Sequence, residues 1–246
     1  MNLTDQNLRE KEFHDKLQSK SKGRFENIFY KAILNAWEDF YNFLDLNAKN
    51  SEILDYGCGV GPAIERVIKL NPKKITGIDI SDVSISKAKE KFQSLNSKVE
   101  LLVDNCESTT FSNNKFDLVY GLGILHHLQF SKCIDEISRI LKPGGVLLFI
   151  EPLGTNPLIN FYRLLTPKSR SKDEHPLVFK DFEKIKSSFK SVNIKYYGFL
   201  TLAFFPFYSS KDSRVFKVLV KLDQLLFKIK IFRYFAWSVL ITAKKN

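Results

Sequence analysis

The sequence predicts an α/β protein in which helices cover both faces of a doubly wound parallel sheet. Short apolar runs that fit buried strands alternate with segments of helical composition, which favours right-handed crossovers between parallel strands. A glycine-rich turn separates the first such run from the helix that follows it. The length of 246 residues suits one large domain with insertions.

The stretch at 53–61, Ile-Leu-Asp-Tyr-Gly-Cys-Gly-Val-Gly, is central to this prediction. Ile53 and Leu54 fit a short buried strand, and the glycines let the backbone turn sharply and approach a ligand closely. Pro62 stands where a helix at 63–70 would begin, so the turn presents a helix N-terminus to a nucleotide-like or carboxylate-bearing cofactor. A dinucleotide-binding fingerprint would need a third small residue at Pro62 and is therefore excluded. A tight turn without a ligand remains the alternative.

The other elements follow in order along the chain. Helices are predicted at 7–22 and, with an apolar face, at 25–46. Downstream, strands are predicted at 74–80, 99–103, 116–120, 146–150, 192–197 and 237–243. Helices are predicted at 83–95, with Ser81 as N-cap, at 133–141 and at 177–189, and Lys-Pro-Gly-Gly at 142–145 predicts a turn.

An acid closes the predicted strand at 74–80. Asp79 would lie at the carboxyl end of the second strand, beside the glycine turn, where a carboxylate can accept hydrogen bonds from the ribose of a bound nucleoside. The alternative is that Asp79 caps the next helix and binds nothing.

The cysteines and the N-terminal composition exclude several classes of protein. Cys58, Cys106 and Cys133 lie far apart without paired ligand spacing, so we expect no metal site and no disulfide framework, as suits a reducing cytoplasm. Residues 1–22 lack the apolar core of a signal peptide, and no apolar run reaches the roughly 18 residues of a spanning helix. We therefore expect a cytoplasmic protein without a spanning helix.

The net charge of +11 is concentrated in the C-terminal part of the chain. Residues 1–151 hold 20 basic and 21 acidic side chains, whereas residues 152–246 hold 18 and 6. This asymmetry suggests an anionic partner, which could be a membrane surface, an acidic acceptor or nucleic acid. A solvated basic surface without a partner is the alternative.

Several motifs together carry a family resemblance. Asp55 precedes the glycines, Gly-Leu-Gly-Ile-Leu-His-His-Leu follows the fourth strand at 121–128, and a Leu-Lys-Pro-Gly-Gly turn joins a helix to an apolar strand. Over 53–151 the chain resembles the class I S-adenosylmethionine (SAM) dependent methyltransferases. The resemblance implies a Rossmann-like seven-stranded sheet of order 3-2-1-4-5-7-6, with the last strand antiparallel.

The resemblance also implies a division of the chain. A single domain over 1–246 would consist of an N-terminal helical lid at 1–50, a SAM-binding core at 51–151, and insertions at 152–176 and 199–236. Phe25 and Tyr30 would belong to this lid or pack in the core.

SAM is the cofactor that the resemblance implies, with S-adenosylhomocysteine as product. Gly57 and Gly121 would hold the methionine amino group through backbone carbonyls, and Asp55 would order the turn. Asp79 would bind the ribose and Asp104 the adenine amino group, while Ile80 would stack on the adenine or belong to the core. The expected cofactor-binding residues are Asp55, Gly57, Cys58, Gly59, Gly61, Asp79, Ile80, Asp104, Asn105, Cys106 and Gly121.

The candidate catalytic groups are histidines. A sulfonium methyl is already activated, so the enzyme must mainly align the acceptor and, for a hydroxyl or ammonium, remove a proton. His126 and His127 follow the fourth strand beside the expected methyl group, and His127 matches a position where related enzymes often carry histidine. His175 and His14 are weaker candidates.

The two insertions are expected to build the acceptor pocket, because both leave the carboxyl edge of the sheet. Aromatic and aliphatic residues crowd 196–208, and apolar residues alternate with basic ones over 215–235. We therefore expect a small lipophilic acceptor, such as a quinone, polyketide, isoprenoid or lipid-linked sugar.

The basic segment at 212–235 would either contact an anionic membrane at its cytoplasmic face or pack on its own sheet. Nucleic acid is disfavoured, because the basic residues do not form a solvent-facing stripe. An inactive SAM-binding or membrane-surface scaffold is the second hypothesis for the whole chain. The acceptor, the atom methylated and the oligomeric state stay open.

Overall fold

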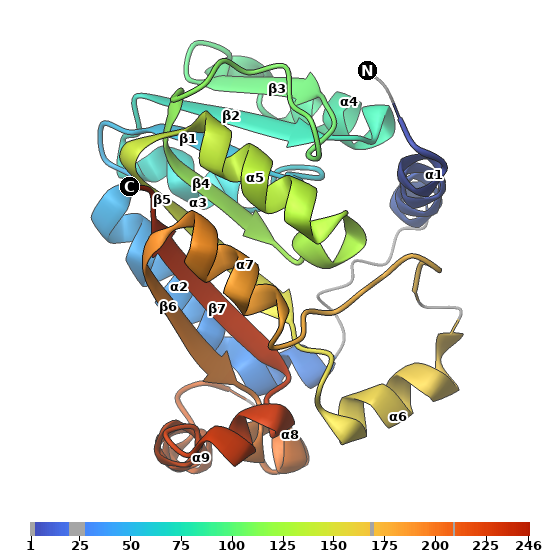
Figure 1. Ribbon diagram of the computed structural model, residues 1–246, viewed down its shortest axis with the longest axis vertical. Helices are drawn as coiled ribbons and strands as arrows, with labels where there is room; N and C mark the ends of the chain where they lie inside the picture. The colour runs from blue at the N-terminus through green and yellow to red at the C-terminus, as the bar shows by residue number, and fades with distance from the viewer. Residues whose placement is uncertain (1–2, 20–27, 168–169, 209) are drawn as a thin grey trace.

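The computed structural model of the chain describes residues 3–19, 28–167, 170–208 and 210–246 (Figure 1). Within these ranges seven strands form one sheet in the order β3-β2-β1-β4-β5-β7-β6. The strands are β1 Glu52–Tyr56, β2 Lys74–Asp79, β3 Val99–Val103, β4 Phe116–Leu122, β5 Leu141–Pro152, β6 Lys190–Tyr197 and β7 Ser238–Lys244. Only β7 pairs antiparallel with its neighbours, β5 and β6. The predicted topology is confirmed.

Helices cover both faces of this sheet (Figure 1). The α-helices are α1 Asp5–Ser19, α2 Leu34–Asn47, α3 Ile64–Val67, α4 Asp82–Lys91, α5 Phe130–Ile140, α6 Pro157–Leu165, α7 Asp181–Ser188, α8 Leu200–Ala203 and α9 Arg214–Leu226. The 3-10 helices are η2 Ile28–Ile33, η3 Ile68–Leu70, η4 Gln93–Leu95, η5 Leu125–His127, η7 Phe205–Phe207 and η8 Lys230–Phe235. α5 and α7 share one core with the sheet, whereas α2, α3 and α4 share the core on the other face.

The two cores follow from the alternation of side chains along the strands. In β4, Val119 points into the core beneath α5, and Leu118 and Tyr120 point into the core beneath α2. α5 buries Ile134 and Ile137 from one helical stripe. Both faces of the central strands are covered, as expected for parallel strands.

The residues predicted as a turn at 142–145 are part of β5 but interrupt its regular pairing with β4. Leu141 pairs with Phe116 of β4. Gly144 donates its amide to the carbonyl of Lys245 (3.2 Å), and Lys245 donates to the carbonyl of Gly145 (2.8 Å). Val146 then pairs with Leu118, so five positions along β5 match two along β4, and Gly144 has a φ of 76°. The backbone therefore turns locally within β5. The end of the chain supplies hydrogen-bond partners for this irregular segment, and this long-range pairing is invisible in the local sequence.

Several helices differ in extent from their predicted ranges. The helix predicted at 63–70 begins at Ile64 and becomes 3-10 at η3. α4 has the expected N-cap, since Ser81 Oγ accepts from the Ser84 amide at 3.0 Å. α7 is shorter than predicted at its start, where Leu177 forms a bridge to Leu153.

The predicted N-terminal and C-terminal helices are also divided. The helix predicted at 25–46 is 3-10 over η2 before α2 begins, and Phe25 lies outside the described residues, as does the end of the predicted helix at 7–22. The basic segment at 215–235 is split between α9 and η8.

The carboxyl edge of the sheet is covered by three segments that are distant in sequence. β5 leads into α6 and β6 leads into α8, which confirms that both insertions leave this edge (Figure 1). α1 joins them through paired hydrogen bonds of 2.8 Å from the Arg9 guanidinium to the Asp173 carboxylate. Among the described helices, none has the length and apolarity needed to cross a bilayer.

Candidate cofactor and acceptor site

The loop after β1 has the left-handed backbone that its glycines predict. Gly57, Gly59 and Gly61 have φ values of 75°, 53° and 75°. A Cβ on Gly57 would lie 2.5 Å from Cγ1 of Ile124, and one on Gly61 would lie 2.5 Å from Cε2 of Phe92. Nothing lies within 4 Å of the corresponding point on Gly59. The loop is therefore closely packed at both ends and open in its middle.

Asp79 joins this loop to the start of α4. Its Oδ2 accepts from the Gly59 amide and its Oδ1 from the Ser81 amide, each at 2.9 Å. Burial raises the pKa of this carboxyl, and the two amides oppose that shift. A carboxylate offers about four lone-pair sites, so each oxygen can accept a further hydrogen bond from a ligand.

Asp55 lies beneath the loop. Its Oδ2 accepts from the Tyr120 hydroxyl at 2.9 Å, which links paired positions of β1 and β4. Complete burial raises the pKa of Asp55 to about 7. Its contact is thus with the neighbouring strand, and the ordering of the loop by Asp55 stays a prediction.

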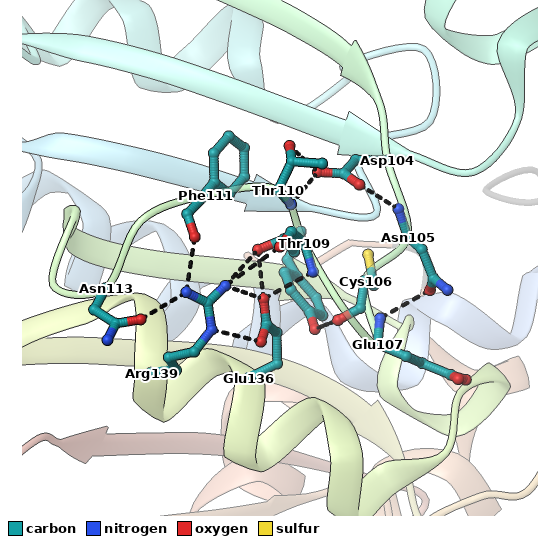
Figure 2. Close-up of polar contacts among 11 residues, drawn as sticks. Asp104, Asn105, Cys106, Glu107, Thr109, Thr110, Phe111, Asn113, Glu136 and Arg139 are labelled. Atoms are coloured by element: carbon teal, nitrogen blue, oxygen red, sulfur yellow. Dashed lines mark hydrogen bonds and ion pairs between the residues drawn. The ribbon is translucent and has the colours of Figure 1, made fainter. Parts of the chain in front are cut away.

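Asp104 closes the loop that follows β3 (Figure 2). Its Oδ1 accepts from the Asn105 amide at 2.8 Å, and its Oδ2 accepts from the amide and hydroxyl of Thr110 at 2.9 Å. The Asp104 amide donates to the carbonyl of Asp79 (3.1 Å), so the structure brings the two predicted acids side by side. Asn105 Oδ1 accepts from the Glu107 amide at 2.9 Å.

A charged pair on α5 anchors the same loop from below (Figure 2). Glu136 Oε1 accepts from the Thr109 amide at 2.8 Å. Arg139 donates to both oxygens of Glu136, at 2.6 and 2.9 Å, and to the carbonyl of Phe111 at 2.7 Å. Sequence reasoning missed both residues, because acidic and basic residues three apart on a helix ordinarily indicate a solvated face.

The remaining predicted cofactor residues have packing roles in the structure. Cys58 and Cys106 are buried, and desolvation raises the pKa of both thiols, which keeps them neutral. A Cβ on Gly121 would lie 2.4 Å from Cε1 of Phe149, so close packing alone requires glycine there. Ile80 is half-buried directly after Asp79.

His126 is buried and paired with an acid that sequence reasoning missed. Its Nδ1 lies 2.7 Å from Oε2 of Glu151. Glu151 Oε1 accepts from the amides of Ile124 (2.9 Å) and Leu125 (2.8 Å), and burial raises its pKa to about 7. The sequence position of Glu151 could have indicated a site residue, because Glu151 follows the fifth predicted strand just as Asp79 closes the second.

Charged residues of the first insertion lie on the other side of His126. Its Nε2 is 4.0 Å from Glu174, and Arg163 of α6 is 3.1 Å from the same Glu174 oxygen. His175 is close only through its backbone, whose amide donates to the His126 carbonyl at 2.6 Å; its side chain is exposed. The surroundings of His126 are thus polar.

His127 is also buried but faces α1. Its Nδ1 lies 3.0 Å from Oε2 of Glu10, and its ring contacts that of His14 at a centroid distance of 5.0 Å. The two adjacent histidines therefore have separate acidic partners.

The chain matches known methyltransferases over this part of the structure. A family profile described as a methyltransferase domain matches residues 53–145, from β1 into β5. Phosphoethanolamine N-methyltransferase 3 of Arabidopsis thaliana is 31% identical over 147 residues, which are 56% of this chain and 30% of that protein. A sterol 24-C-methyltransferase of Gibberella zeae is 32% identical over 136 residues, which are 54% of this chain and 35% of that protein. The chain spans about a third of the length of these relatives.

A solved structure resembles nearly the whole chain. The N-methyltransferase NodS of Bradyrhizobium japonicum, in complex with S-adenosylhomocysteine, aligns with a TM-score of 0.61 over 95% of this chain and 98% of that one. The sequences are 15% identical, so this likeness concerns the fold.

Proposed function

We propose, because this chain belongs to the class I SAM-dependent methyltransferases, that it transfers a methyl group from SAM to a small acceptor. The observation that carries the proposal is the half-buried Asp79 carboxylate, joined to Gly59 in the open part of the glycine loop. An inactive SAM-binding scaffold is the competing reading, and the intact acids and glycines disfavour it.

The residues of the carboxyl edge fit this cofactor. When bound, SAM supplies a methyl group already activated for in-line displacement. Asp79 would accept the ribose hydroxyls with its remaining lone pairs, and Gly57 and Gly121 would hold the amino group through their carbonyls. Asp104 and Asn105 would border the adenine, on a loop that Glu136 of α5 anchors by a hydrogen bond.

His126 is the residue best suited to accept a proton from the acceptor. With Nδ1 donating to Glu151, Nε2 becomes the nitrogen that takes up a proton. Glu151 then stabilises the imidazolium that forms. Glu174 and Arg163 would position a polar group of the acceptor beside it.

We further propose that the acceptor is lipophilic and is reached at an anionic membrane surface. α6 exposes Leu158, Phe161, Leu164 and Leu165, each between 56% and 78% exposed. α9 exposes Val215, Val218, Leu222 and Leu225 at helical spacing, between 42% and 57% exposed. Both helices lie at the same end of the molecule (Figure 1). Lys217, Lys221 and Lys228 add positive charge there, which suits anionic lipid headgroups.

Binding and turnover measured separately test the proposed activity. Calorimetric titration with SAM is expected to show one site, and incubation with lipid extracts is expected to release S-adenosylhomocysteine. Binding without release on quinone, polyketide, isoprenoid and glycolipid acceptors would favour the scaffold. Absence of SAM binding by the folded chain would overturn the proposal.

Flotation with vesicles tests the membrane proposal. The chain is expected to bind phosphatidylglycerol vesicles, to bind phosphatidylcholine vesicles less, and to be released by salt. Leu222→Glu combined with Leu225→Glu should weaken binding by more than about tenfold, because burying a leucine contributes about 1.5–3 kcal/mol. Leu46→Glu is the matched control, since Leu46 is 85% exposed at the end of α2. An equal loss of vesicle binding in the α9 double variant and in Leu46→Glu would contradict the proposal. Equal binding to anionic and neutral vesicles would also contradict it.

A further inference from the structure

Three side chains that commonly bind metals meet between α1 and η5. Glu10, His14 and His127 each offer one donor atom, and these atoms all lie within 4.8 Å of one another. Oε2 of Glu10 is 3.0 Å from Nδ1 of His127 and 3.7 Å from Nε2 of His14. One ion could therefore contact all three after small side-chain adjustments.

The buried atoms of this cluster lack hydrogen-bond partners. Among the described residues, Glu10 Oε2 and both ring nitrogens of His127 are buried without a partner of hydrogen-bonding geometry. The Glu10–His127 approach is short, but its direction is unsuited to a hydrogen bond, so it counts as an ion-pair contact at most. Unpaired buried polar atoms are costly and rare, and this cluster concentrates three of them.

The protein holds these groups in place from several sides. Glu10 and His14 are four residues apart and share one face of α1. Ser171 donates its hydroxyl to the other Glu10 oxygen. Gln6 donates to the His127 carbonyl at 3.4 Å. Such outer contacts are typical of residues that orient metal ligands.

We propose that Glu10, His14 and His127 bind a divalent transition-metal ion, with Zn²⁺ as the best match. Two imidazoles and one carboxylate form a known zinc donor set, and imidazole favours Zn²⁺ over Mg²⁺ and Ca²⁺. Three protein ligands leave a fourth tetrahedral position for water or another ligand. The sequence expectation of no metal site rested on cysteine spacing, which does not detect this donor set.

The ion would tie α1 to the segment after β4. α1 already pairs with the first insertion through Arg9 and Asp173, and with α4 through Lys11 and Asp82. α1 thus spans the carboxyl edge, and a metal bound by Glu10 and His14 would hold the middle of this helix in place. This assignment gives His127 to the metal and leaves the His126–Glu151 pair for proton transfer. The proposal does not depend on methyl transfer.

Metal titration of the full chain, after chelator treatment, tests the site directly. Calorimetry with Zn²⁺ is expected to show one ion per chain, and Co²⁺ should give the visible absorption of low-coordinate cobalt bound by nitrogen and oxygen. His14→Ala and Glu10→Gln should each weaken binding by about 100-fold. His175→Ala is the matched control, because it removes an exposed histidine outside the cluster.

Hydrogen exchange supplies a readout that does not require a variant to fold. Zn²⁺ should slow amide exchange in α1 and leave β6 and β7 unchanged. Absence of stoichiometric binding, binding unaffected in His14→Ala and Glu10→Gln, or unchanged exchange in α1 would each overturn the proposal. SAM titration of the metal-free chain separates this failure from failure of the proposed activity.

Discussion

Asp79→Asn is expected to weaken SAM binding by about 10- to 100-fold. The carboxylate accepts the amides of Gly59 and Ser81 and keeps lone pairs for the ribose hydroxyls. An asparagine has one acceptor oxygen, and its NH₂ group would face a backbone amide, which is also a donor. Loss of a hydrogen bond to a charged group costs about 1.5–3 kcal/mol, which corresponds to this range of affinity. Calorimetric titration of the wild-type and Asp79→Asn chains with SAM measures this change in affinity.

Asp82→Asn provides the matched control. Asp82 lies three residues further on, is exposed, and pairs with Lys11 on α1. Its replacement changes the charge by the same amount close to the same loop, and we expect less than about a threefold effect on affinity because exposed ion pairs contribute little. Equal affinities of wild-type and Asp79→Asn chains, with thermal unfolding showing both folded, would rule out the assigned role of Asp79.

Residues that sit where a strand ends were accessible from the sequence. Asp79 was located because it closes an apolar run and follows the glycine loop along the chain. The same rule applies to Glu151, which follows the apolar run of the fifth strand. The acid that partners His126 therefore has a position in the sequence as clear as that of Asp79.

Other parts of the site depend on tertiary contacts that no local pattern contains. Residues 142–145 form an irregular, turn-like part of β5, and their place inside a strand depends on pairing with Lys245. Arg139 supports the loop after β3 only because α5 is docked beneath it. Glu10 and His127 are distant in sequence and meet because α1 crosses the sheet edge. Local rules thus predicted the strands and the acids Asp79 and Asp104 at the ends of β2 and β3, whereas the contacts of α1 required the folded chain.

Asp55→Asn is expected to stabilise the protein at alkaline pH and to remove part of its pH dependence. The pKa of Asp55 is raised to about 7 in the folded chain by burial, from 3.8. Between about pH 4 and 7 the unfolded chain loses this proton while the folded chain keeps it, so wild-type stability falls as pH rises and levels off above 7. Asparagine cannot ionise, and its oxygen can still accept from Tyr120. The gain in the free energy of unfolding of Asp55→Asn over the wild-type chain at pH 8 has an upper bound of about 4 kcal/mol.

Urea unfolding of both chains at several pH values isolates this effect. Glu151 and Asp79 also have raised pKa values, but they titrate in both chains and largely cancel in the difference. The difference in unfolding free energy should be near its minimum at pH 4, grow through pH 7 and stay constant above it. Tyr120→Phe is the complementary control, because it removes the hydrogen bond that favours the ionised Asp55 carboxylate. In this variant the unfolding free energy should fall further with rising pH than it does in the wild-type chain. A difference that does not change with pH would mean that Asp55 ionises normally in the folded chain, and the buried link between β1 and β4 would then have to admit water.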